Sequence, residues 1–245
     1  MPACLAPLRS TIVSMGGRRH PEVVRRPLPW PLWWALAINI GMVVLHALNH
    51  SQLNPFGRPM YFFHLNAEQN LPTWWATLQL YTVALLLGVA ASRATGPGRW
   101  GAWLATGIAA FLSLDEFAQF HERVGVWLRT EAMTTGGILP LTGIWPILLG
   151  SLLAGACLAS MWLGRSVWRS DPTAGALLLG GALTLIASAA GLELLINLVS
   201  PDSELLPWQV ALEELGELIG AWLALWGAWR YAVVSKGTAT ILPEA

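Results

Sequence analysis

Six long apolar segments are the feature that most constrains how this chain of 245 residues can fold. Each segment approaches or exceeds the roughly 18 to 20 residues that an α-helix needs to cross a bilayer. Hydrophobic residues make up 55% of the chain and charged residues 11%, whereas a soluble domain carries about 25% charged residues. The sequence therefore predicts an all-α, polytopic integral membrane protein with six transmembrane helices in one bundle.

The expected spans follow one another with no internal repeat and no linker long enough to divide the chain. They cover residues 29–48, 74–91, 100–120, 144–163, 174–199 and 208–234. A basic N-terminal tail occupies residues 1–28, the transmembrane domain 29–234 and a C-terminal tail 235–245. The first apolar run is long and lacks a small-residue cleavage site, so we expect a retained helix. Met15 is a second candidate for the start of the chain.

The distribution of basic residues predicts the orientation in the membrane. Eleven of the 14 Lys and Arg residues lie in the N-terminal tail, the second and fourth loops and the C-terminal end, and three lie in the other loops. Positive charge favours the cytoplasmic side, so both termini are expected in the cytoplasm of a cell with this protein in its inner or plasma membrane. The formal net charge of zero argues against a nucleic-acid partner, and the oligomeric state is left open.

Acidic residues inside the expected spans are the main functional signal. The stretch FLSLDEFAQFHERVG contains Asp115, Glu116 and His121, and further acids are Glu193 in the fifth span and Glu213 in the sixth. Each such charge costs about 2.5 to 3.5 kcal/mol in a bilayer when nothing compensates it. No Lys or Arg lies at their depth, so we expect these acids to be protonated, hydrated or bound to a cation.

Helical periodicity predicts how these groups are arranged. Asp115, Glu193, Glu213 and Glu217 are expected to converge in the outer half of the bundle. At roughly 100° per residue, His121 points about 120° away from Asp115 unless the helix loosens between them. Small residues at Gly216 and Gly220 would let another helix approach the sixth span closely.

Histidines gather on the same side of the expected topology. His46 and His50 lie one turn apart at the end of the first span, and His64 and Glu68 have the same spacing in the following loop. Aromatic residues favour the membrane interface and prolines discourage a continuous helix. We therefore expect this loop to fold back over the outer mouth of the bundle, the alternative being an interfacial loop in which His64 and Glu68 are hydrated.

A divalent transition metal would suit this collection of carboxylates and imidazoles, with zinc, iron or manganese favoured by ligand hardness. The candidate catalytic residues are Asp115, Glu116 and His121. The candidate metal ligands are His46, His50, His64, Glu68, Asp115, Glu193, Glu213 and Glu217.

Three classes of function are consistent with such a site. The first is a metal-dependent membrane hydrolase that acts on a lipid or another outer-leaflet substrate, where a metal-bound water attacks an ester or amide. The second is a cation or proton transporter that uses intramembrane carboxylates. The third is a non-catalytic membrane scaffold.

Three strings, FHLNAEQNLPTWW, LSLDEFAQFHE and LEELGELIG, resemble those of small bacterial multi-pass membrane proteins to which no activity is assigned. More distantly, Ser113, Asp115 and the pair His46 and His50 resemble the zinc site of ceramidase-like membrane hydrolases, which uses three His and an Asp beside a Ser. In that group the paired histidines belong to the last helix, whereas the last span here carries Glu213, Glu214 and Glu217. The HxxHH clusters and ExxH pairs of membrane di-iron enzymes are not found in the sequence.

Overall fold

A computed structural model describes residues 28–50, 57–58, 60–65, 70–128, 144–195, 198 and 206–238 of the protein. All regular secondary structure in these residues is helical. The elements are α1 (Trp30–His50), η1 (Tyr61–Phe63), α2 (Leu71–Arg93), α3 (Arg99–Ala118), α4 (Phe120–Trp127), α5 (Trp145–Leu163), α6 (Arg165–Trp168), α7 (Pro172–Ile186), the π-helical segment η3 (Ala187–Leu192), α8 (Glu193–Leu195) and α9 (Leu206–Thr238).

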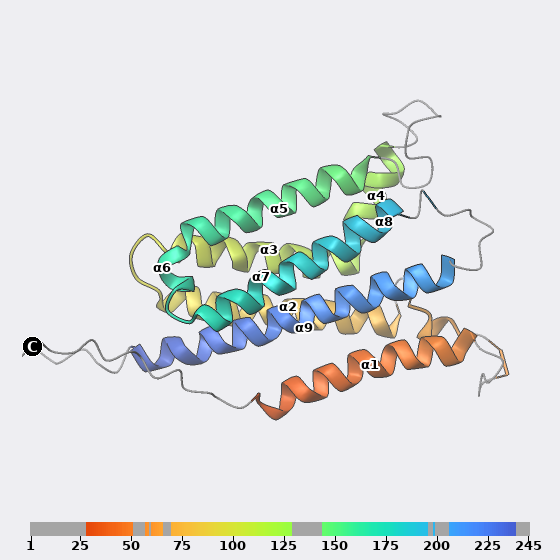
Figure 1. The fold of residues 1–245 in the computed structure, drawn as a ribbon, viewed down its shortest axis with the longest axis horizontal. Coiled ribbons are helices and arrows are strands. Elements are labelled where there is room, and N and C mark those ends of the chain that lie inside the picture. Colours follow the sequence, from red (N-terminus) through yellow and green to blue (C-terminus); the bar gives the residue numbers. More distant parts are fainter. Residues whose placement is uncertain are drawn as a thin grey trace, which may run out of the picture.

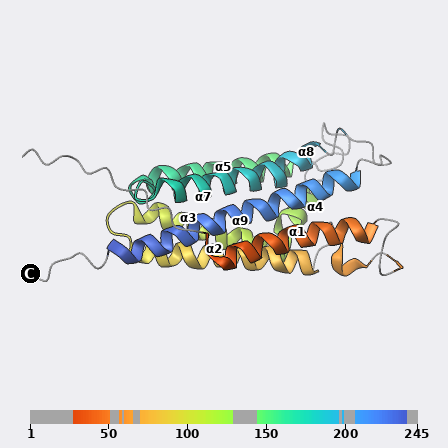
Figure 2. The same cartoon turned by 60° about the horizontal axis from the view of Figure 1, so that its bottom comes forward.

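The longer helices form one elongated bundle in which each runs antiparallel to the next (Figure 1). The start of α1, the connection from α2 to α3, α6 and the end of α9 lie together at what we term the α6 end. The opposite, α4 end holds α4, α8 and the start of α9. Figure 2 shows α5 and α7 on one side of the bundle and α1 and α2 on the other, with α9 between them. The prediction of an all-helical bundle is confirmed.

Four of the described helical stretches are long and apolar enough to cross a membrane: Trp30–Asn49, Leu71–Arg93, Trp145–Leu163 and Pro172–Leu195. Helices α3 and α9, with 20 and 33 residues, run beside them through the bundle. Many large apolar side chains on the outer faces are exposed, among them Leu152 and Trp162 on α5. Such faces are favourable in hydrocarbon and unfavourable in water.

Close packing of α7 against α9 depends on small residues, as the sequence predicts for Gly220. A Cβ atom placed on Gly220 would lie 2.9 Å from the backbone nitrogen of Leu185 and 3.0 Å from the carbonyl oxygen of Gly181. A Cβ atom on Gly216 would collide with the Ser188 side chain. Small residues bring helix backbones together in membranes, where packing replaces the hydrophobic effect as the driving force.

The first prediction compares two glycines in the middle of helices. We expect Gly220→Ala to lower the free energy of unfolding by about 1 to 3 kcal/mol, because its methyl group would overpack the contact with α7. Gly107→Ala, which places a methyl group where no atom lies within 4 Å, should have no such cost. Thermal unfolding of both variants in the same detergent tests this, and equal effects at the two positions would contradict the packing described.

A buried amide network attaches α1 to the bundle. Asn39 is 0% exposed, and its Nδ2 donates to the carbonyl oxygen of Leu218 at 2.9 Å and to Oε1 of Gln79 at 3.3 Å. Its Oδ1 accepts hydrogen bonds from Nε1 of Trp75 at 2.7 Å and from Nε2 of Gln79 at 3.0 Å. Because every amide group of Asn39 has a partner, its burial stabilises this arrangement of α1, α2 and α9.

A second polar contact fixes the α6 end. Asp171 accepts a hydrogen bond from the backbone nitrogen of Ala174 at 3.1 Å and so caps α7. The same carboxylate binds Arg230 of α9 through Nε at 3.0 Å and Nη2 at 3.1 Å. Tyr231 donates its hydroxyl hydrogen to the carbonyl oxygen of Trp168 at 2.7 Å. One acidic residue therefore links the start of α7 to the end of α9.

Candidate functional site

The expected third span, residues 100–120, is not one continuous helix. Helix α3 ends at Ala118, Gln119 takes a left-handed conformation with φ 57° and ψ 40°, and α4 begins at Phe120. Among the described residues Gln119 is the only non-glycine residue with positive φ, a conformation that costs roughly 1 to 2 kcal/mol for an L-residue. The turn redirects the chain within a single residue.

This turn brings His121 back onto Asp115. Nδ1 of His121 lies 2.7 Å from Oδ2 of Asp115, and the backbone nitrogen of His121 donates to Oδ1 at 3.0 Å. Because His121 is the second residue of α4, the carboxylate of Asp115 caps that helix from the preceding one. In a continuous helix the side chains of Asp115 and His121 would point about 120° apart. The break at Gln119 interrupts the helix and lets the two side chains meet.

Helix α5 closes over this pair. Trp145, the first residue of α5, is buried, and its ring centroid lies 5.0 Å from that of His121. A Cβ atom on Gly125 would lie 2.5 Å from Cδ1 of Trp145, so the absence of a side chain at Gly125 lets the indole pack against α4. These contacts leave the Asp115 side chain 8% exposed and that of His121 25% exposed.

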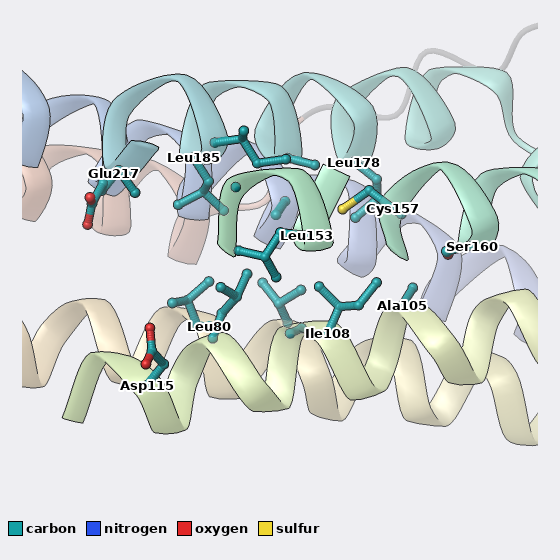
Figure 3. Close-up of a pocket in the computed structure, with 18 of the residues that line it drawn as sticks. Leu80, Ala105, Ile108, Asp115, Leu153, Cys157, Ser160, Leu178, Leu185 and Glu217 are labelled. Carbon is teal, nitrogen blue, oxygen red and sulfur yellow. The ribbon is translucent and has the colours of Figure 1, made fainter. Parts of the chain in front are cut away.

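Asp115 and His121 lie at one end of an elongated cavity of about 160 Å³. Its walls come from α2, α3, α4, α5, α6, α7, η3 and α9, and most of the lining residues are apolar. Figure 3 shows Asp115 and Glu217 on opposite walls at one end, with Cys157 and Ser160 towards the other. Glu116 also lines the cavity. The cavity therefore has one polar end, at α4, and a long apolar body.

A second hollow, of about 240 Å³, borders the same pair. Asp115 and His121 line it together with residues of α3, α4 and α5. Several of these residues, including Phe111, Phe120 and Leu152, have exposed side chains. The carboxylate–histidine pair thus borders both the interior of the bundle and its apolar outer surface.

Two further acids lie near the polar end of the cavity. Glu213 is close enough to Glu193 and His121 to interact with both electrostatically, and Glu217 interacts in the same way with His121. The expected fifth span, residues 174–199, contains the π-helical segment η3, after which α8 begins at Glu193. A π turn holds extra residues and so changes the direction of the side chains that follow it.

The histidines of the first span and the following loop lie elsewhere. Nδ1 of His46 accepts a hydrogen bond from the backbone nitrogen of Leu65 at 3.1 Å, and its ring contacts that of His64 with centroids 5.3 Å apart. Leu65 is 2% exposed and packs with Leu218 of α9. The described part of the loop therefore folds back onto α1, α2 and α9, and neither histidine is among the residues that line the cavity.

The described residues contain no group of three or more His, Cys, Asp or Glu side chains placed to hold a metal ion. Of the candidate ligands, Glu68 and the side chain of His50 lie outside the described residues. The predicted divalent metal therefore stays a prediction.

Sequence reasoning missed the residues that position the pair. Trp145 and Gly125 are separated by 20 positions, and their contact depends on how α4 and α5 pack. Gln119 carries no signal in the sequence, since Gly or Asn is the usual residue in a left-handed turn. The FHE string marks the right region, but it does not show that the chain turns there.

The electrostatics of His121, in α4 beyond the third expected span, lead to the second prediction. Burial by itself lowers the pKa of the imidazole, but the hydrogen bond and attraction to Asp115, with smaller effects of Glu122 and Glu217, raise it to about 9. The folded protein thus holds this proton more tightly than the unfolded chain. The contribution of this proton to the free energy of unfolding is fully present below about pH 6.5 and is lost as the pH rises through about 9.

Asp115→Asn should reduce this loss of stability with rising pH, because it removes the charge that raises the pKa of His121. Thermal unfolding across that pH range, with wild type, Asp115→Asn and Glu122→Gln in parallel, measures the effect. Glu122→Gln should retain most of the pH dependence, since Glu122 contributes less. Identical pH profiles for wild type and Asp115→Asn would show that the pair does not hold the proton in this way.

Comparison with known proteins places the chain in a family without assigning it an activity. No curated protein and no solved structure matches it. The family described as Domain of unknown function (DUF8692) matches residues 34–233. This range begins within α1 and ends within α9, and it includes every described residue of the cavity and of the Asp115–His121 pair. The protein is therefore a member of the DUF8692 family.

Proposed function

We propose that this protein is an integral membrane hydrolase that cleaves an ester or amide bond of an amphiphile taken from the bilayer. The observation that carries the proposal is the position of the Asp115–His121 pair, which borders both the internal cavity and the hollow on the apolar outer surface. A lipid-like molecule could reach the pair from the bilayer and place its chain in the cavity. Its polar group would then lie among the few ionisable side chains of the lining.

Asp115, His121 and Glu217 each have a defined part in this reaction. Asp115 holds Nδ1 of His121 at 2.7 Å, so Nε2 is the ring nitrogen that exchanges a proton with the substrate. Glu217, on the opposite wall, takes a proton from water as the water oxygen bonds to the carbonyl carbon. His121 donates its proton to the leaving alcohol or amine as the bond to the carbonyl carbon breaks. Proton transfer from Glu217 to His121 then restores the site.

The body of the cavity favours a hydrocarbon chain over an ion. Away from the polar end, the polar side chains among its described lining residues are Cys157, Ser160 and Trp168. The Ser160 hydroxyl donates a hydrogen bond to the carbonyl oxygen of Gly101 at 2.9 Å. Nε1 of Trp168 donates a hydrogen bond to the backbone carbonyl oxygen of Ser160 at 3.0 Å. A proton or cation pathway needs polar groups along its length, so this cavity supports the hydrolase more than the transporter.

The proposal includes six membrane spans, formed by α1, α2, α3, α5, α7 with its π-helical continuation, and α9. Both termini then lie on the cytoplasmic side, because the α6 end carries Arg93, Arg99, Arg165, Arg169 and Arg230 and positive charge favours that side. The Asp115–His121 pair accordingly lies near the outer leaflet.

The third prediction tests this orientation with reporter fusions. A reporter that is active only in the cytoplasm should be active when fused after Lys236, at the end of α9, and inactive when fused after Trp127, at the end of α4. The two fusions control for each other because three expected membrane crossings separate them, which places them on opposite sides of the membrane. Activity at Trp127 and none at Lys236 would reverse the proposed orientation.

The fourth prediction concerns the chemistry. Purified protein in lipid nanodiscs should release a fluorescent fatty acid from ester-linked or amide-linked lipids. Removal of a general acid–base group typically costs a hundredfold or more in rate, so Asp115→Asn and His121→Gln should each slow release by about 100-fold or more. Glu217→Gln should slow release to a similar extent, because a neutral amide cannot take the proton from water.

The control is Glu122→Gln, which neutralises an exposed neighbour of His121 and should leave the rate unchanged. Melting temperatures of all four variants, measured at the pH of the assay, show whether each variant is folded at the assay temperature and so separate a loss of chemistry from a loss of folding. Full activity in Asp115→Asn and His121→Gln would refute the acid–base site. If no hydrolysis occurs and proton flux across the membrane depends on Glu217, the alternative of a cation or proton transporter is supported instead.

A further inference from the structure

A tight crossing of α3 and α5 closes the end of the cavity that lies away from Asp115 and His121. A Cβ atom on Gly101 of α3 would collide with the backbone of Gly164, the residue that follows α5. A Cβ atom on Gly164 would in turn collide with the indole of Trp168. The two helices therefore approach each other here with no side chain between their backbones.

Hydrogen bonds hold this crossing in place. The Ser160 hydroxyl binds the carbonyl oxygen of Gly101, and the indole nitrogen of Trp168 binds the carbonyl oxygen of Ser160. Tyr231 of α9 donates its hydroxyl hydrogen to the carbonyl oxygen of Trp168 at 2.7 Å. Ser160 and Trp168 are 3% and 5% exposed, and both line the cavity. Because displacing either side chain would leave buried polar groups without partners, these two residues form a fixed floor.

The space above this floor is elongated and small. Helix α5 contributes lining residues from Leu149 to Met161, a length of roughly 18 Å at 1.5 Å per residue. Figure 3 shows Leu153 of α5 and Ile108 of α3 facing each other across the cavity.

The volume limits how much hydrocarbon can enter. The cavity measures about 160 Å³, and an apolar protein cavity of about 150 Å³ accepts a ligand of the size of benzene. By the same measure the space holds on the order of six to eight carbon atoms. An elongated space of this volume accommodates one chain and has no room for a second.

We propose that the cavity selects amphiphiles with a single apolar chain of medium length, with the chain end against the floor formed by Ser160 and Trp168 and the cleaved bond beside the Asp115–His121 pair. Cys157, which lies nearly one turn of α5 before Ser160, would border the far part of this chain. This inference rests on the proposed function, because the chain belongs to the substrate of that site. It goes further by naming the number and length of the chains and the residues that set the limit.

The fifth prediction places the chain end with an uncharged probe that cannot be hydrolysed. Octanol with a diazirine at the end of its chain is photoactivated with the full-length protein in lipid nanodiscs, and labelled residues are mapped by mass spectrometry. Label is expected near the floor, on Cys157, Ser160 and Met161. Label confined to exposed α5 residues such as Leu152 and Leu158 would show that the probe stays in the bilayer and would overturn the proposal.

Competition against this probe measures the limit on the chain. Straight-chain alcohols of four to sixteen carbons are compared at equal mole fraction in the bilayer, because each added methylene group also favours partition into lipid. Potency should rise up to about eight carbons, and hexadecanol should be about tenfold weaker than octanol because part of its chain cannot enter. Heptadecan-9-ol, which carries two eight-carbon chains on one carbon atom, should compete as poorly as hexadecanol.

Variants at neighbouring positions of α5 assign the limit to the cavity. Cys157→Phe fills the far part of the cavity and should shift the most potent competitor to a shorter alcohol, whereas Leu158→Phe, at a side chain that is 67% exposed, should leave it unchanged. Cys157→Leu adds less volume and should cause a smaller shift, which keeps the test possible if the Phe variant does not fold. A general loss of structure would weaken all alcohols alike and would not change their order.

Three results would contradict the proposed selection. They are equal potency of octanol and hexadecanol, competition by heptadecan-9-ol as strong as that by octanol, and the same chain-length order in Cys157→Phe and Leu158→Phe.

This binding experiment is independent of turnover. If the competitors show the expected limit but no lipid is hydrolysed, the proposed chemistry fails and the chain selectivity stands. If hydrolysis depends on Asp115 but alcohols of all lengths compete equally, the chemistry stands and the chain selectivity fails.

Discussion

The candidate site depends on the hydrogen bonds between Asp115 and His121. These hydrogen bonds require an unfavourable backbone conformation at Gln119. A left-handed residue costs roughly 1 to 2 kcal/mol. The carboxylate of Asp115 offsets this cost by accepting hydrogen bonds from both the ring and the backbone of His121. One side chain therefore ends α3, begins α4 and orients the imidazole. Strained backbone that is held in place by its surroundings is a common property of functional sites.

The cavity exists because α5 is held to its neighbours at separated points. At the α4 end Trp145 packs on Gly125, and further along α5 a Cβ atom on Gly150 would lie 2.9 Å from Cβ of Ala190. At the α6 end the Ser160 hydroxyl binds the carbonyl oxygen of Gly101. Between these contacts α5 lines the cavity from Leu149 to Met161. A hydrocarbon chain of the proposed substrate would make dispersion contacts with the apolar walls of this cavity.

Polar groups within the bundle fall into two kinds with different consequences. Asn39 and the Asp171–Arg230 ion pair have partners in fixed geometry, and they determine how α1, α7 and α9 are placed. Asp115, Glu116 and Glu217 instead line one end of the cavity, where Asp115 is paired with His121. The bundle thus uses some buried polar contacts for its architecture and gathers ionisable side chains at one end of its cavity.

The sequence by itself determined the helices, because apolar runs of bilayer length have few alternatives to a helical structure once water is absent. It also located the acids of α3 and α9 and predicted the close approach at Gly220, since both follow from the periodicity of a straight helix. The position of His121 depended on a left-handed residue at Gln119, which periodicity cannot show. The separation of His46 and His64 from Asp115 was decided by the burial of Leu65 against α9. Contacts between residues far apart in the chain follow from how helices pack, and only the tertiary structure specifies that packing.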